Sequence, residues 1–456
     1  MCEASKIIEL NIPEGAAYVL HQLREAGYEA YVVGGCVRDS LLHRVPDDWD
    51  ITTSARPEEV KEVFRRTIDT GIQHGTVTVM VGKESYEVTT YRVDGEYADG
   101  RHPNSVTFTP NLLEDLKRRD FTINAMAYNP GVGIVDEFNG IQDLENKTIR
   151  AVGDPQQRFT EDALRMMRAV RFSAQLDAVI EDETAAAIRR LAPNLQLVSA
   201  ERIRVELEKL LLSGHPGKIR DAYQLGLMDV FLPELVTCWH CEQNNPHHCY
   251  SVGEHIVHSV GAVRRDKVLR LTMLLHDIAK QECKRTDENG VDHFRGHVEK
   301  SAQMADEILR RLKYDNATRE TVVTLISWHD RQLGESRTVV RRSISKLGKD
   351  LFPLLLEVKR ADAAAQSDYE RAAKLARLDY WQSEYDAIVS AGDPLTIRDL
   401  AVTGKDLIAA GVHPGVQMGE ILNEMLKDVL AQPSHNTREH LLRTWVKTEP
   451  ENAENP

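Results

Sequence analysis

Strand-like patterns occupy only the first third of this 456-residue chain, and that uneven distribution constrains its fold more than any other feature. β-branched and aromatic residues dominate 76–81 and 86–91, and a short apolar run at 31–33 leads into two glycines. Further along the chain, apolar residues instead recur at helical spacing, as in 161–172 and 201–212. The sequence therefore predicts an α+β head, with a mixed sheet and helices, followed by all-α regions.

The length of the chain exceeds what one hydrophobic core usually supports, which favours two to four domains. The polar stretch 238–246 ends in proline and is typical of a domain boundary. We expect a head, a helical neck, a second helical domain and a helical tail, at 1–150, 151–240, 241–370 and 371–456.

The formal net charge of −14 argues against a surface coated with basic residues for indiscriminate nucleic-acid binding. Basic residues nevertheless gather at 117–119, 165–171 and 202–204, where we expect any RNA contacts. No stretch approaches the roughly 18 apolar residues of a membrane span, and the first ten residues lack an export signal. Six cysteines in so long a chain are expected to be reduced thiols. These patterns favour a cytoplasmic protein with no membrane segment and leave the oligomeric state open.

Two aspartates, Asp48 and Asp50, are separated by one residue in a strand-like segment, so alternation would turn both carboxylates to one face of a sheet. Paired carboxylates can hold magnesium beside a triphosphate, where the metal activates an attacking 3′-hydroxyl and stabilises the leaving pyrophosphate. Glu87, in a later strand pattern, either supplies a third carboxylate or is a solvent-facing strand residue.

A glycine turn precedes this pair of aspartates. Gly34 and Gly35 follow a strand pattern and open a short helical pattern that contains Arg38. Glycines let backbone amides approach phosphate oxygens, and the arginine adds a fixed positive charge. The combination predicts a phosphate cradle, whereas the glycines alone would indicate only a sharp connection.

Several linked segments now carry a family resemblance. They are GGCVRD, DWDI, RRDFTINAMA at 118–127, RFTEDALRMMRAVRF at 158–172 and SAERIRVELEKLL at 199–211. In this order and spacing they resemble the class II nucleotidyltransferases, which include bacterial CCA-adding enzymes and poly(A) polymerases. The resemblance covers about the first half of the chain.

The resemblance implies template-independent addition of CCA to the 3′ end of tRNA from CTP and ATP. It implies that Asp48 and Asp50 hold Mg²⁺. It also implies nucleotide contacts from a set of head and neck residues: Gly35, Arg38, Arg119, Asp162, Arg165, Arg168 and Arg171. For Arg168 and Arg171, solvation of a helix face is an equal alternative.

Base selection can be reasoned from the residues themselves. Asp162 and Arg165 are three residues apart, so on a helix their side chains would meet on one face. Cytosine and adenine both present an amino donor beside a ring-nitrogen acceptor, which a carboxylate and a guanidinium would complement. Uracil and guanine present a carbonyl at that place and would be rejected. A surface ion pair is the simpler alternative.

The second half contains a histidine, a His-Asp pair and a distant aspartate, namely His255, His276, Asp277 and Asp362. This pattern resembles the HD-domain superfamily, which implies an unidentified divalent transition metal and a metal-bound water nucleophile. His297 and His329 are candidates for a second metal position, and a structural relic without metal is the alternative. A zinc site at Cys238 and Cys241 would have an incomplete ligand set. His248 is a candidate for lining the HD pocket instead.

Three functional alternatives remain open at this point. One is a poly(A) polymerase or an enzyme that adds only the terminal A, and another is an HD phosphohydrolase whose head merely binds RNA. The third is a non-catalytic RNA-binding module, which would have no need of the pair Asp48 and Asp50. The segment 94–106 lacks an apolar period and is expected to be a loop; by resemblance, its full length favours addition of the terminal A. The tail, 371–456, is expected to contact tRNA.

Overall fold

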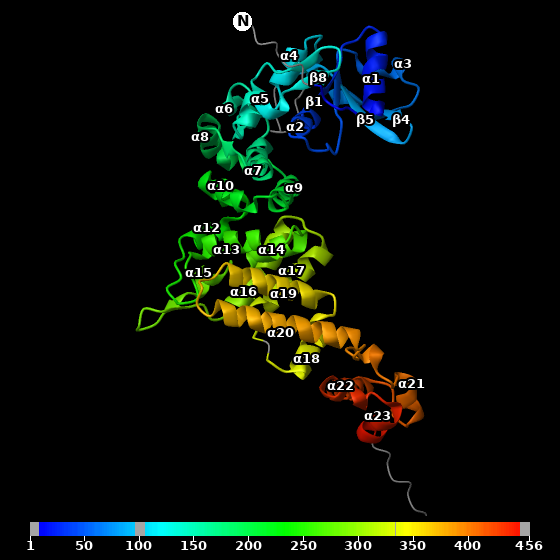
Figure 1. Ribbon diagram of the computed structural model, residues 1–456, viewed down its shortest axis with the longest axis vertical. Coiled ribbons are helices and arrows are strands. Elements are labelled where there is room, and N and C mark those ends of the chain that lie inside the picture. Colours follow the sequence, from blue (N-terminus) through cyan, green and yellow to red (C-terminus); the bar gives the residue numbers. More distant parts are fainter. Residues whose placement is uncertain (1–8, 96–104, 333, 447–456) are drawn as a thin grey trace, which may run out of the picture. The chain divides into compact units, whose positions relative to one another are not determined.

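The computed structural model describes residues 9–95, 105–332 and 334–446 (Figure 1). The chain divides into two compact units, Met1–Val236 and Thr237–Pro456. Strands concentrate in the first unit, and the described part of the second is almost wholly helical. The predicted fold class, an α+β head followed by helical regions, is confirmed.

A seven-stranded sheet in the order β3-β4-β5-β2-β1-β8-β9 forms the centre of the head. Its strands are β1 (Ala30–Val33), β2 (Ile51–Thr53), β3 (Thr67–Gly71), β4 (Thr76–Val81), β5 (Glu84–Thr90), β8 (Ala127–Asn129) and β9 (Gly133–Val135). Strands β2 and β5 run parallel, whereas the other neighbouring pairs of this sheet are antiparallel.

Helices cover both faces of this sheet. They are α1 (Glu14–Glu25), α2 (Gly35–Leu41), α3 (Pro57–Val63), α4 (Leu112–Lys117) and α5 (Gly140–Glu145), with short turns η1 (Ile72–His74) and η2 (Thr122–Asn124). Along β1, Val32 packs into a core that includes residues of α1, while Tyr31 and Val33 pack with Leu116 of α4. Because β1 is buried on both sides, the glycine turn that follows it has a rigid support.

The expected loop at 94–106 starts where β6 (Arg92–Asp94) ends and reaches β7 (Val106–Phe108), and these two strands pair antiparallel. Residues 96–104 lie outside the described residues.

The neck is helical with one exception. Its helices are α6 (Pro155–Glu161), α7 (Leu164–Leu176), α8 (Asp182–Leu191), α9 (Ala200–Leu211), α10 (Ile219–Gln224), α11 (Met228–Phe231) and α12 (Pro233–Trp239), with η3 (Ala192–Leu197) and η4 (Pro216–Lys218). The prediction of an all-α neck missed a short parallel ladder between β10 (Thr148–Ile149) and β11 (Val179–Ile180). Two-residue strands leave too little alternation to be recognised in a sequence.

The second unit begins with a group of mutually packed helices. They are α13 (Val252–Ala262), α14 (Lys267–Leu275), α15 (Lys280–Cys283), α16 (His297–Arg311), α17 (Asn316–His329), α18 (Arg337–Leu347), α19 (Leu351–Ala364) and α20 (Arg371–Ser390). A short hairpin of β12 (Arg285–Thr286) and β13 (Asp292–His293) interrupts the helical pattern.

The tail contains η5 (Ile397–Asp399), α21 (Gly404–Ala409), α22 (Val416–Ala431), η6 (Pro433–His435) and α23 (Arg438–Trp445). These elements share a small core that includes Leu407, Met425, Val429 and Leu441. Among the helices of the described residues, none combines the length and hydrophobicity that crossing a bilayer requires.

Candidate nucleotide-binding and metal-binding sites

The three head carboxylates come from the segment just before β2 and from the middle of the neighbouring strand β5. Asp48 and Asp50 lie just before β2, not within a strand as the alternation predicted. The backbone of Asp50 is nevertheless aligned with the sheet, because its carbonyl accepts the amide of Val33 at 3.0 Å. Ile51 pairs with Val88 in the parallel ladder, so continuing this register by one residue places Glu87 beside Asp50. Pairing therefore brings together carboxylates that are far apart in the sequence.

These carboxylates influence one another electrostatically. Although Asp50 stays partly open to solvent, desolvation raises the pKa of its carboxyl group above the usual range. The positive charge of Arg119 opposes that rise, and the negative charges of Glu87 and Asp48 add to it. A divalent cation among the three carboxylates would relieve this repulsion, so the residues present fit the Mg²⁺ that the family implies.

The turn after β1 requires glycine, because its backbone is left-handed and an arginine side chain lies close to it. Gly34 has φ +83°, and a Cβ at this position would lie 2.9 Å from Nη1 of Arg119. Arg38 of α2 donates to Asn124 Oδ1 at 2.6 Å and pairs with Asp39 at 2.8 Å. Gly35 starts α2 beside this arginine. The predicted cradle residues therefore lie together at one place.

Two arginines of α7 are already engaged in ion pairs. Arg168 is 2.6 Å from the buried carboxylate of Asp120 and holds the pKa of that group below its usual range, against the opposing effect of burial. Arg171 is only 7% exposed and pairs with Glu206 of α9. Both guanidinium groups lie near the ring of Phe172, at 5.4 and 3.8 Å from its centroid. A nucleotide contact from Arg171 would have to disturb a buried pair.

Asp162 and Arg165 do not meet on one helical face, contrary to the prediction. The helix expected at 161–172 is interrupted, because Asp162 is extended and its side chain accepts the amide of Leu164 at 3.0 Å. Its other partner is Arg202 of α9, at 2.7 Å. Arg165 instead pairs with Glu161 at 2.7 Å. Asp162 and Arg165 still flank the same interruption between α6 and α7.

The ion-pair partners of Asp162, Arg165 and Arg171 were not predicted from the sequence. Glu161, Arg202 and Glu206 each hold one of the candidate nucleotide-binding side chains. The sequence alone predicts for Arg202 only membership of a basic cluster for RNA contacts. The available signal was their location inside the segments 158–172 and 199–211, which carry the family resemblance.

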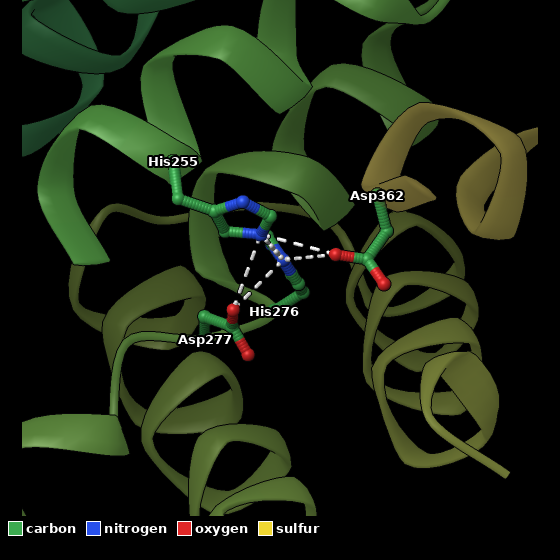
Figure 2. Close-up of side chains that lie close together, drawn as sticks. All are labelled: His255, His276, Asp277 and Asp362. Carbon is green, nitrogen blue, oxygen red and sulfur yellow. Dashed lines mark hydrogen bonds and ion pairs between the residues drawn. The ribbon is translucent and has the colours of Figure 1, made fainter. Parts of the chain in front are cut away.

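The second unit brings four predicted metal ligands together (Figure 2). His255 comes from α13, Asp362 comes from α19, and His276 and Asp277 follow α14 directly. Nε2 of His255 lies 3.1 Å from Nε2 of His276 and 3.0 Å from Oδ1 of Asp362. Nε2 of His276 lies 3.2 Å from Oδ2 of Asp277. Side chains from α13, α19 and the end of α14 therefore bring their nitrogen and oxygen atoms together in one cluster.

Backbone carbonyls orient the histidines of this cluster. Nδ1 of His255, His276, His297 and His329 faces the carbonyls of Ala365, Met273, Phe294 and Ile326, at 3.2, 2.8, 2.7 and 2.7 Å. An imidazole that donates from Nδ1 presents the lone pair of Nε2, which is the arrangement that metal-binding histidines require. The residues present therefore fit a divalent transition metal.

A second position adjoins the first through the same aspartate. Oδ1 of Asp277 faces Nε2 of His297 at 3.4 Å and Nε2 of His329 at 3.6 Å. Burial would lower the pKa of His276, but Asp277 and Asp362 override this effect and raise it to about 10. The carboxylates thus favour a positive charge at the cluster, which a metal ion would provide.

A cavity of about 920 Å³ opens beside the cluster, and both Asp277 and Asp362 line it. Other lining residues bring positive charge and hydrogen-bond donors: Lys280, Lys359, Lys374, Arg377 and His248. Burial lowers the pKa of Lys359 to about 8. The cavity is large enough for a nucleotide-sized molecule with a phosphate group.

Cys238 and Cys241 are free and buried, and burial raises the pKa of Cys238. Within the described residues, the side-chain groups close enough to hold a metal contain no cysteine.

Comparison with known proteins identifies the class to which this fold and site belong. The family model "Poly A polymerase head domain" matches residues 30–150, and "Probable RNA and SrmB- binding site of polymerase A" matches 179–238. A third, "tRNA nucleotidyltransferase domain 2 putative", matches 292–445. The chain is a nucleotidyltransferase with a poly(A) polymerase-type head.

Individual relatives define the family more closely. A CCA-adding enzyme of Levilactobacillus brevis is 37% identical over 439 residues, which are 94% of this chain and 96% of the relative. One of Lactobacillus helveticus is 58% identical over 218 residues, 48% of this chain and 54% of the relative. The structure of the Bacillus stearothermophilus CCA-adding enzyme in complex with CTP matches with a TM-score of 0.68 and 30% identity, over 93% of this chain and 94% of that one. The chain belongs to the CCA-adding enzymes.

Proposed function

We infer that this chain completes the 3′ end of tRNA by adding C, C and A from CTP and ATP. Each step joins the terminal 3′-oxygen of the RNA to the α-phosphorus of a nucleotide and releases pyrophosphate. The observation that carries this inference is the grouping of Asp48, Asp50 and Glu87 beside the Gly34 turn. It occurs in a chain that belongs to the CCA-adding enzymes. The proposed location is the cytoplasm.

In the head, Asp48 and Asp50 would hold Mg²⁺, and Glu87 would add a third negative charge beside them. The metal would supply activation of the attacking hydroxyl and stabilisation of the leaving pyrophosphate. Gly35 leaves room for phosphate oxygens near the start of α2, and Arg38 supplies a positive charge fixed by Asn124. Arg119 lies between the turn and Asp50, where it would meet the triphosphate.

In the neck, Asp162 would accept from the amino group of cytosine or adenine while Arg165 donates to the ring nitrogen. Without a bound base, Arg202 forms an ion pair with the carboxylate of Asp162. A bound base would have to share this carboxylate with Arg202. Arg168 and Arg171 would add positive charge behind this pair, although Arg171 acts mainly through its contact with Glu206.

A division into four domains accompanies this assignment of roles. We propose a head at 1–150, a neck at 151–240, an HD domain at 241–370 and a tail at 371–456 that contacts tRNA. The first boundary agrees with the head match at 30–150, and the second lies close to the division between the two units.

A second activity is favoured by the four Nε2 atoms that converge on Asp277. His255, His276, Asp277 and Asp362 would hold a divalent transition metal, which would supply a water nucleophile for hydrolysis of a phosphate ester. The cationic side chains of the cavity would bind that ester. This second site would not require the head.

The decisive experiment supplies tRNA that ends at the discriminator base, with CTP and ATP offered separately and together. A CCA-adding enzyme extends by two residues with CTP alone and by three with both nucleotides. A poly(A) polymerase would add a run of A with ATP alone, and an A-only enzyme would require tRNA that already ends in CC. Either of those results would replace our inference.

A further inference from the structure

A separate group of metal-capable side chains lies in the tail, formed by Asp428, His435 and His440. Asp428 is near the end of α22, His435 ends η6, and His440 lies in the first turn of α23. His435 Nδ1 is 2.8 Å from Asp428 Oδ1, and His440 Nε2 is 3.1 Å from Asp428 Oδ2. The three potential ligand atoms lie within 4.8 Å of one another.

The side chains are positioned by packing and remain reachable from solvent. Their exposed fractions are 19% for Asp428, 32% for His435 and 25% for His440. The imidazole rings lie 4.1 Å apart, tilted by 31°, so both present a nitrogen to the same carboxylate. Trp445 Nε1 donates to Asp428 Oδ2 at 3.4 Å and helps to orient it. Such an outer hydrogen bond is typical around metal-binding carboxylates.

The ligand types select a class of metal. Two imidazole nitrogens and one carboxylate oxygen suit Zn²⁺ and similar ions, whereas Mg²⁺ and Ca²⁺ prefer oxygen ligands alone. The potential ligand atoms of Asp428, His435 and His440 lie within 4.8 Å of one another, so one metal ion could contact all three. Water would complete its coordination.

The tail also has a structural use for such an ion. In the described part of the tail, the core consists of seven buried hydrophobic residues with partly buried ones packed against them. Small cores are commonly reinforced by a metal or another crosslink. We propose that Asp428, His435 and His440 bind a zinc-class divalent ion that ties η6 and α23 to α22.

The test uses the metal-free full chain and counts bound Zn²⁺ by isothermal titration, with Co²⁺ absorption to report a site of nitrogen and oxygen ligands. The test variant carries His435→Asn and His440→Gln, because these amides can donate to Asp428 as Nδ1 and Nε2 do but are poor zinc ligands. The variant should bind one equivalent less than the wild type. The exposed His413 of the same tail provides the control His413→Ala, which should bind as the wild type does.

The HD cluster would also take up zinc, so the titration is repeated in a His276→Ala, Asp277→Ala background. In that background, one equivalent of bound Zn²⁺ should remain, and Zn²⁺ should raise the melting temperature. Adding the two tail substitutions should abolish both the binding and the rise in melting temperature. If the wild type and the tail variant bind equal amounts of Zn²⁺, the proposal is overturned. Asp428, His435 and His440 would then form only a hydrogen-bonded cluster. Absence of zinc binding in the HD-silenced chain would overturn it too.

Discussion

At the scale of single residues, the head concentrates negative charge where we propose that a triphosphate binds. Desolvation raises the pKa of Asp50, Arg119 opposes the rise, and the nearby charges of Glu87 and Asp48 add to it. Neither nucleotide nor tRNA would approach such a group without an intervening cation. This grouping supports the proposal that the carboxylates bind metal.

We expect Asp48→Asn or Asp50→Asn to lower nucleotide addition by about a thousandfold or more, because a metal ligand supplies several kcal/mol of transition-state stabilisation. Single-turnover addition of C to tRNA measures this loss. The neighbouring Asp47 is exposed, and Asp47→Asn is the matched control with expected wild-type activity. Near-normal addition by both test variants, with unchanged melting, would remove the metal assignment.

We expect Asp162→Ala to relax selection against UTP and GTP by roughly 10- to 100-fold, since one good base contact contributes about 1–3 kcal/mol of discrimination. The ratio of kcat/KM for CTP to that for UTP measures the effect. Glu183→Ala, an exposed carboxylate of the same neck, should leave the ratio unchanged. If misincorporation by Asp162→Ala stays at the parental level, base selection lies elsewhere.

At the scale of elements, the neck is organised by ion pairs between helices. Helices α7 and α9 pack against each other, and the pair Arg171–Glu206 is buried between them. A second pair, Asp162–Arg202, joins the interruption before α7 to the same α9. These contacts hold the interrupted segment in place, so α9 positions the candidate base-selecting residues.

We expect Glu206→Ala to destabilise the first unit by about 3–5 kcal/mol, because it leaves the Arg171 guanidinium buried without its carboxylate. The double variant Arg171→Met, Glu206→Leu should lose much less, since it removes both charges and keeps apolar volume. Thermal melting of the full chain, followed by near-ultraviolet circular dichroism, compares the variants. Equal stability of Glu206→Ala and the wild type would contradict a role for this pair.

At the scale of the whole molecule, the two candidate sites lie in different units. The candidate nucleotide-binding residues end with Arg171 in the first unit, and the HD ligands begin with His255 in the second. Neither set contributes a side chain to the other. The chain is therefore built to carry both sites independently.

We expect His276→Ala with Asp277→Ala to abolish any metal-dependent hydrolysis of nitrophenyl phosphate esters and to leave CCA addition within about twofold of wild type. Both assays are run on one preparation, together with thermal melting, because loss of a bound metal can loosen the surrounding helices. His258→Ala, on the same α13 but exposed, is the control. A folded double variant that no longer adds nucleotides would show that the HD region helps to position the tRNA end.

Many of the helices and strands of this protein could be predicted from local sequence patterns. The β-branched and aromatic residues at 76–81 and 86–91 predicted β4 and β5, and helical spacing predicted the neck. Such signals are readable because they depend on neighbours within a few positions of the chain. Family resemblance indicated Asp48, Asp50 and the candidate HD ligands. The candidate HD ligands are spread from His255 to Asp362, so they were proposed from a family resemblance and not from local patterns.

Tertiary structure decided which of these residues meet. Glu87 lies beside Asp50 only because β2 and β5 pair in parallel, and Arg202 reaches Asp162 only because the chain departs from helix at that aspartate. The tail cluster of Asp428, His435 and His440 carried no recognised motif, because a turn between two helices sets its spacing. Sequence determined the elements and the chemical groups, whereas strand register, helix packing and side-chain competition for hydrogen bonds determined the sites, since these depend on residues distant in the chain.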